Sequence, residues 1–165
     1  MIVLGIDPGL ANTGYAVLRI DGREARAVTH GAIVTPAKQD PARRLATIQR
    51  EIVALIEAHR PDAMALESLY IGANPRAILS VGQARGAVLA ACGTHGIESA
   101  EYAPAEIKVA VTGSGRAGKD QIIRMVTLTL ALRDAPATDH AADALAVALC
   151  HAWSSRARAR LGVPA

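Results

Sequence analysis

Aromatic side chains are nearly absent from this sequence of 165 residues, which contains no Phe, one Trp and three Tyr. A core without large rings has to be filled by Ala, Val, Leu and Ile, and this favours close packing of helices on a sheet. Hydrophobic residues make up 51% of the chain and charged residues 20%, a globular composition that excludes a disordered chain. The length corresponds to about one domain with a substantial core.

Cysteine is scarce as well. The only two, Cys92 and Cys150, both lie in apolar stretches, and their spacing excludes a zinc site and a small disulfide scaffold. No stretch has the length and apolar character of a membrane span, and the N-terminus lacks the basic segment and long apolar run of a signal peptide. We therefore expect buried thiols in a cytoplasmic protein.

Lysine occurs only three times, so that Arg supplies 15 of the 18 basic side chains. The formal net charge is +3, and the isoelectric point lies near 9.2. Guanidinium groups match the geometry of phosphate oxygens, so a nucleic-acid partner is allowed, although so small a charge is a weak indication by itself.

The pattern of residues predicts a mixed α/β sheet. Residues 2–34 form three strands, with Asp21-Gly22 as a two-residue hairpin turn, and further strands follow at 62–66 and 96–102. Helices are expected at 41–60, 75–93, 104–111, 119–132 and 138–153. A meander followed by strand–helix–strand units gives a sheet with helices on both faces, in a single domain over residues 1–153 with a short basic tail at 154–165.

Two acidic residues stand where predicted strands end. Asp7 closes the first apolar strand and is followed by Pro8-Gly9, and Glu67 closes the strand at 62–66. In open α/β sheets this edge is where ligands bind. Asp7 alone would serve equally well as an ordinary turn residue. Glu67 favours a ligand-binding site, because it closes an otherwise apolar strand. Burying its carboxylate there is costly unless a partner such as a divalent cation compensates the charge.

A third acidic element opens the last predicted helix. His140 and Asp143 are three residues apart, which places them on one face, and Asp139 and Asp143, four apart, form an equally possible pair. Acids in a first helical turn also stabilise the helix dipole, and Thr138 or Asp139 could merely cap the helix. With Asp7 and Glu67, three or four such ligands would hold divalent cations.

These motifs together resemble the RuvC family of Holliday-junction resolvases, within the ribonuclease-H-like superfamily, nearly from end to end. The resemblance rests on GIDPG at 5–9, Thr13-Gly14-Tyr15, ALE at 65–67, GQARG at 82–86, Lys108, the Gly113–Lys119 loop and HAADALAVAL at 140–149. It implies a ribonuclease-H-like mixed five-stranded sheet. It also implies a structure-selective endonuclease that resolves four-way DNA junctions in recombination and repair by two-metal phosphodiester hydrolysis.

By the same resemblance, the catalytic and metal-binding residues are Asp7, Glu67, His140 and Asp143. They would hold Mg²⁺ or Mn²⁺, two ions per subunit. Many members of the family carry Asp where His140 stands, so the choice between His140 and Asp139 stays open. Imidazole binds Mn²⁺ more readily than Mg²⁺, so a ligand at His140 predicts a preference for Mn²⁺.

The resemblance further implies contacts with DNA. Tyr70 matches an aromatic residue that wedges against bases at the centre of the junction, and Lys108 and Lys119 match cations beside the site. Tyr70 could equally be a core residue that follows a strand. We expect the DNA phosphates to be bound by some subset of the cations Arg76, Arg85, Lys108, Arg116 and Lys119. The expected partners are four-way junction DNA, a second copy of the chain bound through the helix at 74–92, and the family's branch-migration complex.

Several other functions deserve comparison. Gly113–Asp120 satisfies GxGxxG and most of a phosphate-binding loop, but Asp120 stands where Ser or Thr should hold Mg²⁺, and this argues against a nucleotide hydrolase. ATPases of the sugar-kinase and actin type need two such domains. A non-catalytic nucleic-acid-binding module gives no reason for Glu67. Another ribonuclease-H-like nuclease is the closest alternative.

Overall fold

A five-stranded sheet forms the centre of the fold in the computed structural model, which describes residues 1–68 and 75–161, with side chains over 1–68 and 78–157. Its strands are β1 (Ile2–Asp7), β2 (Asn12–Asp21), β3 (Glu24–Val34), β4 (Ala63–Glu67) and β5 (Glu98–Tyr102), in the order β3-β2-β1-β4-β5. The first three strands are antiparallel, whereas β1, β4 and β5 are parallel. The predicted mixed α/β sheet is confirmed.

Five helices accompany the sheet in the described residues: α1 (Pro41–His59), α2 (Pro75–Thr94), α3 (Pro104–Thr112), α4 (Lys119–Thr129) and α5 (Asp139–Leu161). The Asp40 carboxylate caps α1 by accepting from the backbone N–H of Ala42 at 3.0 Å. None of these helices is long and apolar enough to cross a membrane.

Two predicted helix ends were wrong. The helix expected over 119–132 ends at Thr129, because Leu130 caps it and Ala131 takes the left-handed conformation. The last helix does not end at residue 153 but continues to Leu161, so most of the predicted tail is helical. The residues after 153 are mainly Ala and Arg, which are good helix formers, and Gly162 and Pro164 follow only later.

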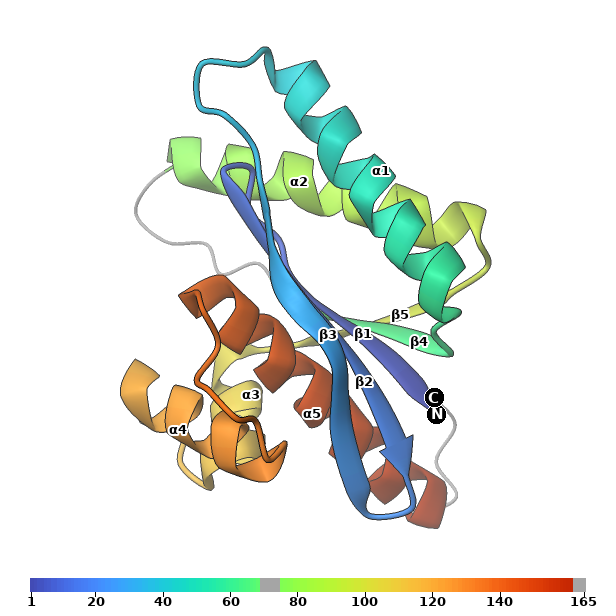
Figure 1. Ribbon diagram of the computed structural model, residues 1–165, viewed down its shortest axis with the longest axis vertical. Coiled ribbons are helices and arrows are strands. Elements are labelled where there is room, and N and C mark those ends of the chain that lie inside the picture. The colour runs from blue at the N-terminus through green and yellow to red at the C-terminus, as the bar shows by residue number, and fades with distance from the viewer. Residues whose placement is uncertain (69–74, 162–165) are drawn as a thin grey trace.

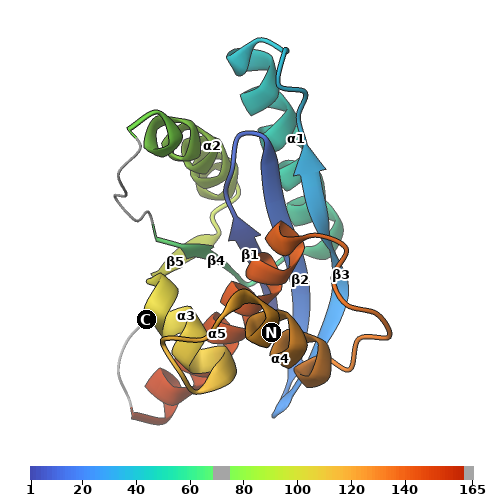
Figure 2. The same ribbon diagram turned by 90° about the vertical axis from the view of Figure 1, so that its left-hand side faces the viewer.

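The helices form two layers around the sheet (Figures 1 and 2). Helices α1 and α2 cover one face, where Leu4, Ile6 and Met64 pack with Ile48 and Ile52 of α1. Helices α3, α4 and α5 cover the other face, where Val3 and alternate strand residues meet α5. As expected for a chain without Phe, the largest fully buried side chains are aliphatic ones and Met64.

Both cysteines are buried thiols outside any disulfide, as predicted. Cys92 lies on α2 beside Met64, with 2.9 Å between the two sulfur atoms. Burial raises the pKa of the Cys92 thiol to about 11, so it is a packing residue and not a nucleophile.

Two glycines allow α5 to lie directly on β1 and β2. A Cβ atom at Gly5 would collide with the backbone oxygen of Ala144 and lie 2.7 Å from the Cβ of Ala148. A Cβ atom at Gly14 would collide with the backbone oxygen of His140. The start of α5 is therefore pressed against the end of β1, where Asp7 lies.

Gly5→Ala should therefore destabilise the protein, because the added methyl group can be accommodated only if α5 moves away from the sheet. Overpacking of this kind costs about 2 kcal/mol, which lowers the Tm by about 6 °C in a chain of this length. The matched control is Gly93→Ala on α2, where a Cβ would meet nothing within 4 Å. Thermal unfolding by circular dichroism checks both. A Gly5→Ala protein as stable as the control would disprove this account of the packing.

Candidate active site

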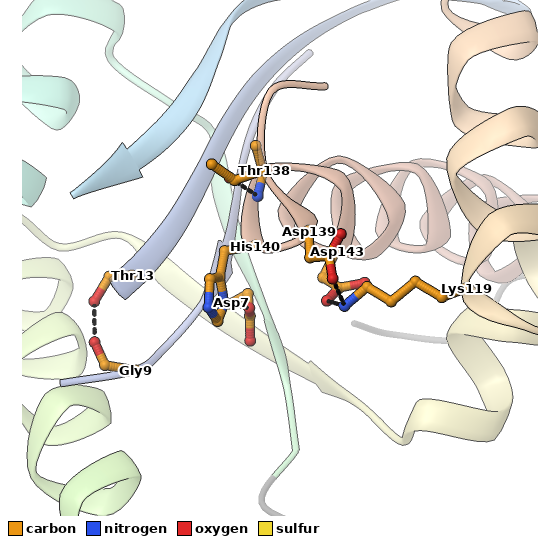
Figure 3. A network of polar contacts seen from close by, with 9 residues as sticks. Asp7, Gly9, Thr13, Lys119, Thr138, Asp139, His140 and Asp143 are labelled. Carbon is orange, nitrogen blue, oxygen red and sulfur yellow. Dashed lines mark hydrogen bonds and ion pairs between the residues drawn. The ribbon is translucent and has the colours of Figure 1, made fainter. Parts of the chain in front are cut away.

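Parallel pairing of β1 and β4 brings the first two acidic residues together. Ile6 pairs with Leu66, so that Asp7 and Glu67 follow as the last residues of neighbouring strands at the same edge of the sheet. Asp7 also pairs with Gly14 across the antiparallel side. The turn between β1 and β2 is closed by Thr13, whose hydroxyl donates to the backbone oxygen of Gly9 at 2.7 Å (Figure 3).

The first turn of α5 adds His140 to this edge. The Nδ1 atom of His140 lies 2.7 Å from Oδ2 of Asp7 (Figure 3). An ionised carboxylate can only accept a hydrogen bond, so Nδ1 carries the proton when Asp7 is charged. This tautomer leaves the lone pair of Nε2 available to a cation. The turn is fixed by Thr138, whose hydroxyl accepts from the N–H of Ala141 at 3.1 Å.

Lys119, the first residue of α4, neutralises the other acids of the same turn. Its ammonium group donates to Oδ2 of Asp143 at 2.9 Å and lies 3.4 Å from Oδ2 of Asp139 (Figure 3). The Asp143 side chain is 25% exposed and that of Asp139 is 65% exposed, so Asp143 is the inner residue of the pair. His140 therefore contacts Asp7, whereas Asp139 lies on the outside with Lys119.

The carboxylates of this group repel one another. Burial, followed by the charges of Asp7 and Asp143, raises the pKa of Glu67 to about 7. Burial also raises the pKa of Asp7, with Asp143 adding to the effect, and the hydrogen bond from His140 opposes it. For Lys119, burial lowers the pKa, but the hydrogen bond and charge of Asp143 outweigh it and leave the pKa raised. The cations present compensate the acids only in part.

This arrangement suits a hard cation by its chemistry. Three carboxylates and one imidazole are ligands that Mg²⁺ and Mn²⁺ accept, and a divalent ion would compensate both the burial and the neighbouring charges that raise the pKa of Glu67. Within residues 1–68 and 75–161, however, no three His, Cys, Asp or Glu side chains already stand as a metal site. Lys119 holds Asp143, and His140 is turned toward Asp7.

A cavity of about 250 Å³ adjoins the acidic group, between α3, α4 and α5. Four of its lining side chains are charged and four are apolar: Glu67, Lys108, Lys119, Asp143, Pro104, Ile107, Ile122 and Ala146. Lys108 and Lys119 thus face the same space as two of the carboxylates. Arg116 is exposed on the connection between α3 and α4.

One predicted DNA-binding residue lies elsewhere. The Arg85 side chain is only 10% exposed, and its guanidinium forms an ion pair with Glu101 of β5, away from the cavity that Lys108 and Lys119 line. The sequence gives the number of cationic side chains but does not show which of them are buried. Glu101 was not predicted, because a lone Glu on a short strand carries no distinctive pattern. Tyr70 and the Arg76 side chain lie outside the described residues.

The rival phosphate-binding loop does not fit this structure. Such a loop follows a strand. Gly113 instead caps the C-terminus of helix α3, with a φ of 77°, and Gly118 precedes α4. This glycine-rich segment therefore joins two helices, and its Lys119 turns toward Asp143.

Comparison with known proteins agrees with these observations. The family model described as crossover junction endodeoxyribonuclease RuvC matches residues 3–151. The protein of that name from Moorella thermoacetica is 48% identical over 160 residues, covering 94% of this chain and 96% of its own length. The protein from Rubrobacter xylanophilus is 45% identical, covering 98% of this chain and 90% of its own length.

Solved structures give the same answer. Thermus thermophilus RuvC in complex with Holliday junction substrate has a TM-score of 0.91 and 34% identity, covering 95% of this chain and 96% of its own. The Fowlpox virus resolvase, at 15% identity and a TM-score of 0.61 over 92% of this chain and 99% of its own, shares the fold. The predicted ribonuclease-H-like fold is confirmed, and the chain belongs to the RuvC family of crossover junction endodeoxyribonucleases.

Proposed function

We propose that this protein is a structure-selective endonuclease that resolves four-way DNA junctions in recombination and repair by metal-dependent phosphodiester hydrolysis. The observation that carries the proposal is the meeting of Asp7, Glu67, His140 and Asp143 at one edge of the sheet, in a chain of the RuvC family. The related Thermus protein was solved with Holliday junction substrate, which supports the choice of DNA substrate.

Nucleases of this family are metal-dependent, and we propose that these four residues hold two Mg²⁺ or Mn²⁺ ions per subunit. When bound, the ions supply Lewis-acid stabilisation of the charge that develops on the phosphodiester. Asp7 orients the His140 imidazole through Nδ1. Lys119, which has a raised pKa and stays protonated, keeps a positive charge beside Asp143 and can stabilise a phosphate oxygen.

Exposed cations around the cavity would bind the DNA backbone. Lys108 and Lys119 line the cavity, and Arg116 lies on the loop between them. The phosphates of a DNA strand entering here would pair with these cations. The strand would then approach the carboxylates from the side of α3 and α4. We propose contacts for Tyr70 and Arg76 from the family resemblance alone.

We further propose that the active form is a homodimer, since a four-way junction presents two equivalent strands to be cut. Helix α2 is the proposed interface, and its Leu79 is 65% exposed, as expected of an apolar residue that a second copy would cover. The family's branch-migration complex is the proposed protein partner, and the cytoplasm, where the bacterial chromosome lies, is the proposed location.

Replacing Glu67 by Gln tests the proposed function. The change keeps the size of the side chain but removes a charged oxygen ligand, so junction cleavage should fall by more than about 100-fold. Metal-free junction binding should persist, because phosphate contacts come from the cations. Single-turnover cleavage of a synthetic four-way junction and a matched duplex, with and without Mn²⁺, measures the first, and fluorescence anisotropy the second.

The control for this experiment is Glu57→Gln, which removes an exposed carboxylate on α1 that belongs neither to the acidic group nor to the lining of the cavity. It should cut like the wild type. If Glu67→Gln cuts equally fast, Glu67 does not serve the reaction, and the proposed site is wrong.

Glu67 also predicts how the stability of the metal-free protein depends on pH. Its pKa is about 7 in the folded state against an ordinary 4.5, so the folded state binds the proton more tightly. Stability is therefore lost as the pH rises from about 4.5 to above 7. Glu67→Gln lacks this dependence, so its Tm should rise relative to the wild type between pH 5 and pH 8. Calorimetry in the presence of a chelator checks this, and a constant difference would contradict it.

The choice of metal depends on His140. Replacing its imidazole by a carboxylate should shift the preference from Mn²⁺ toward Mg²⁺, because Mg²⁺ prefers oxygen ligands. Cleavage rates of His140→Asp and Asp139→Asn, measured over a titration of each metal, check the assignment. If the ratio of rates changes for Asp139→Asn and not for His140→Asp, the ligand is Asp139.

A further inference from the structure

The end of β4 carries Glu67 and needs to be held in place. The carboxylate is partly buried and lies near the charges of Asp7 and Asp143, which together raise its pKa, and β4 ends at this residue. Backbone pairing with β5 continues to Ser68, whose N–H and hydroxyl both donate to the backbone oxygen of Tyr102, at 2.9 and 3.1 Å. On the other side, the pairing of β4 with β1 ends one residue before Glu67, at Leu66.

Arg85 reaches the same point from the other layer. One terminal nitrogen of its guanidinium donates to the backbone oxygen of Glu67 at 3.4 Å, and the other forms an ion pair with the carboxylate of Glu101. Glu101 lies on β5, directly opposite Leu66 of β4. A single side chain of α2 therefore joins the ends of two parallel strands.

The placement of Arg85 suggests a role inside the protein. Its side chain is 10% exposed, and both described contacts are with the ends of β4 and β5. Its partner Glu101 is 49% exposed, so solvent screens the ion pair, and stability alone is a weak explanation for it. The planar fork of Arg can hold a carbonyl oxygen and a carboxylate at fixed angles, which the single ammonium group of Lys cannot.

We propose that Arg85, paired with Glu101, is a positioning residue that fixes the backbone of Glu67 and thereby holds its carboxylate at the reaction site. This inference rests on the proposed function for its effect on catalysis. The mechanical part, that Arg85 restrains the end of β4, rests on the contacts alone. The two parts are measured separately.

The test uses Arg85→Gln, Glu101→Gln and the double variant in the full chain. Mn²⁺ affinity without DNA, measured by isothermal titration, and the single-turnover cleavage rate should each fall by about 10- to 100-fold, the range for residues that orient a metal ligand. Because Arg85 and Glu101 act as one unit, the double variant should lose no more Mn²⁺ affinity or cleavage rate than the single variant that loses more. Amide exchange should rise at residues 64–68 in every variant.

Two controls separate positioning from general destabilisation. Arg50→Gln breaks an exposed ion pair on α1 and should leave all readouts unchanged. Ile48→Val loosens the buried core of α1, lowering the Tm while leaving Mn²⁺ affinity unchanged. If Arg85→Gln fails to fold, Glu101→Gln carries the test, because it leaves the guanidinium in place and removes only its carboxylate partner.

Three results would overturn the inference. Unchanged exchange at 64–68 would show that Arg85 does not restrain the strand. Unchanged Mn²⁺ affinity and cleavage would show that the restraint does not serve the site. Weaker metal-free junction binding with a salt dependence reduced by about one ion would make Arg85 a phosphate contact. A wild type that neither binds Mn²⁺ nor cuts junctions would instead refute the proposed function, while the exchange result still decides the restraint.

Discussion

The contact of helix α5 with β1 and β2 is the constraint on which the site depends. Gly5 and Gly14 lack the Cβ atoms that would hold the helix away from the sheet. The helix in turn contributes several small alanines to the buried core on this face of the sheet. The near absence of aromatic residues agrees with this arrangement, because a large ring between helix and sheet would separate them. The close approach places the first turn of α5, with His140, against Asp7.

The same contact creates an electrostatic cost. Asp7, Glu67 and Asp143 are brought near one another in a partly buried place, and this raises the pKa of both Asp7 and Glu67. Lys119 and His140 offset part of the repulsion. A fold selected for stability alone would not keep three such acids together, so the packing of α5 offsets an unfavourable group of charges that is useful for binding a cation.

The sequence predicted the acids at strand ends more reliably than the cations. Asp7 and Glu67 follow from strand order alone, because parallel strands end at one edge. The choice between His140 and Asp139 depends on which way α5 rotates against Gly14, and spacing does not reveal that. The ion pair of Arg85 was not predicted, because its partner Glu101 lies sixteen residues away on another element. The end of α4 at Thr129 depends on the left-handed conformation of Ala131, and the extension of α5 to Leu161 depends on the helix-forming Ala and Arg residues after position 153.

A histidine at position 140 is reasonable in this environment. A carboxylate in its place would add a third negative charge around Asp7, next to Glu67 and Asp143, and raise their pKa values further. An imidazole carries no negative charge, and here its Nδ1 lies within hydrogen-bond distance of Asp7. The histidine thus lowers the cost of assembling the site before any cation binds. The proposed preference for Mn²⁺ would rest on a nitrogen of the same imidazole.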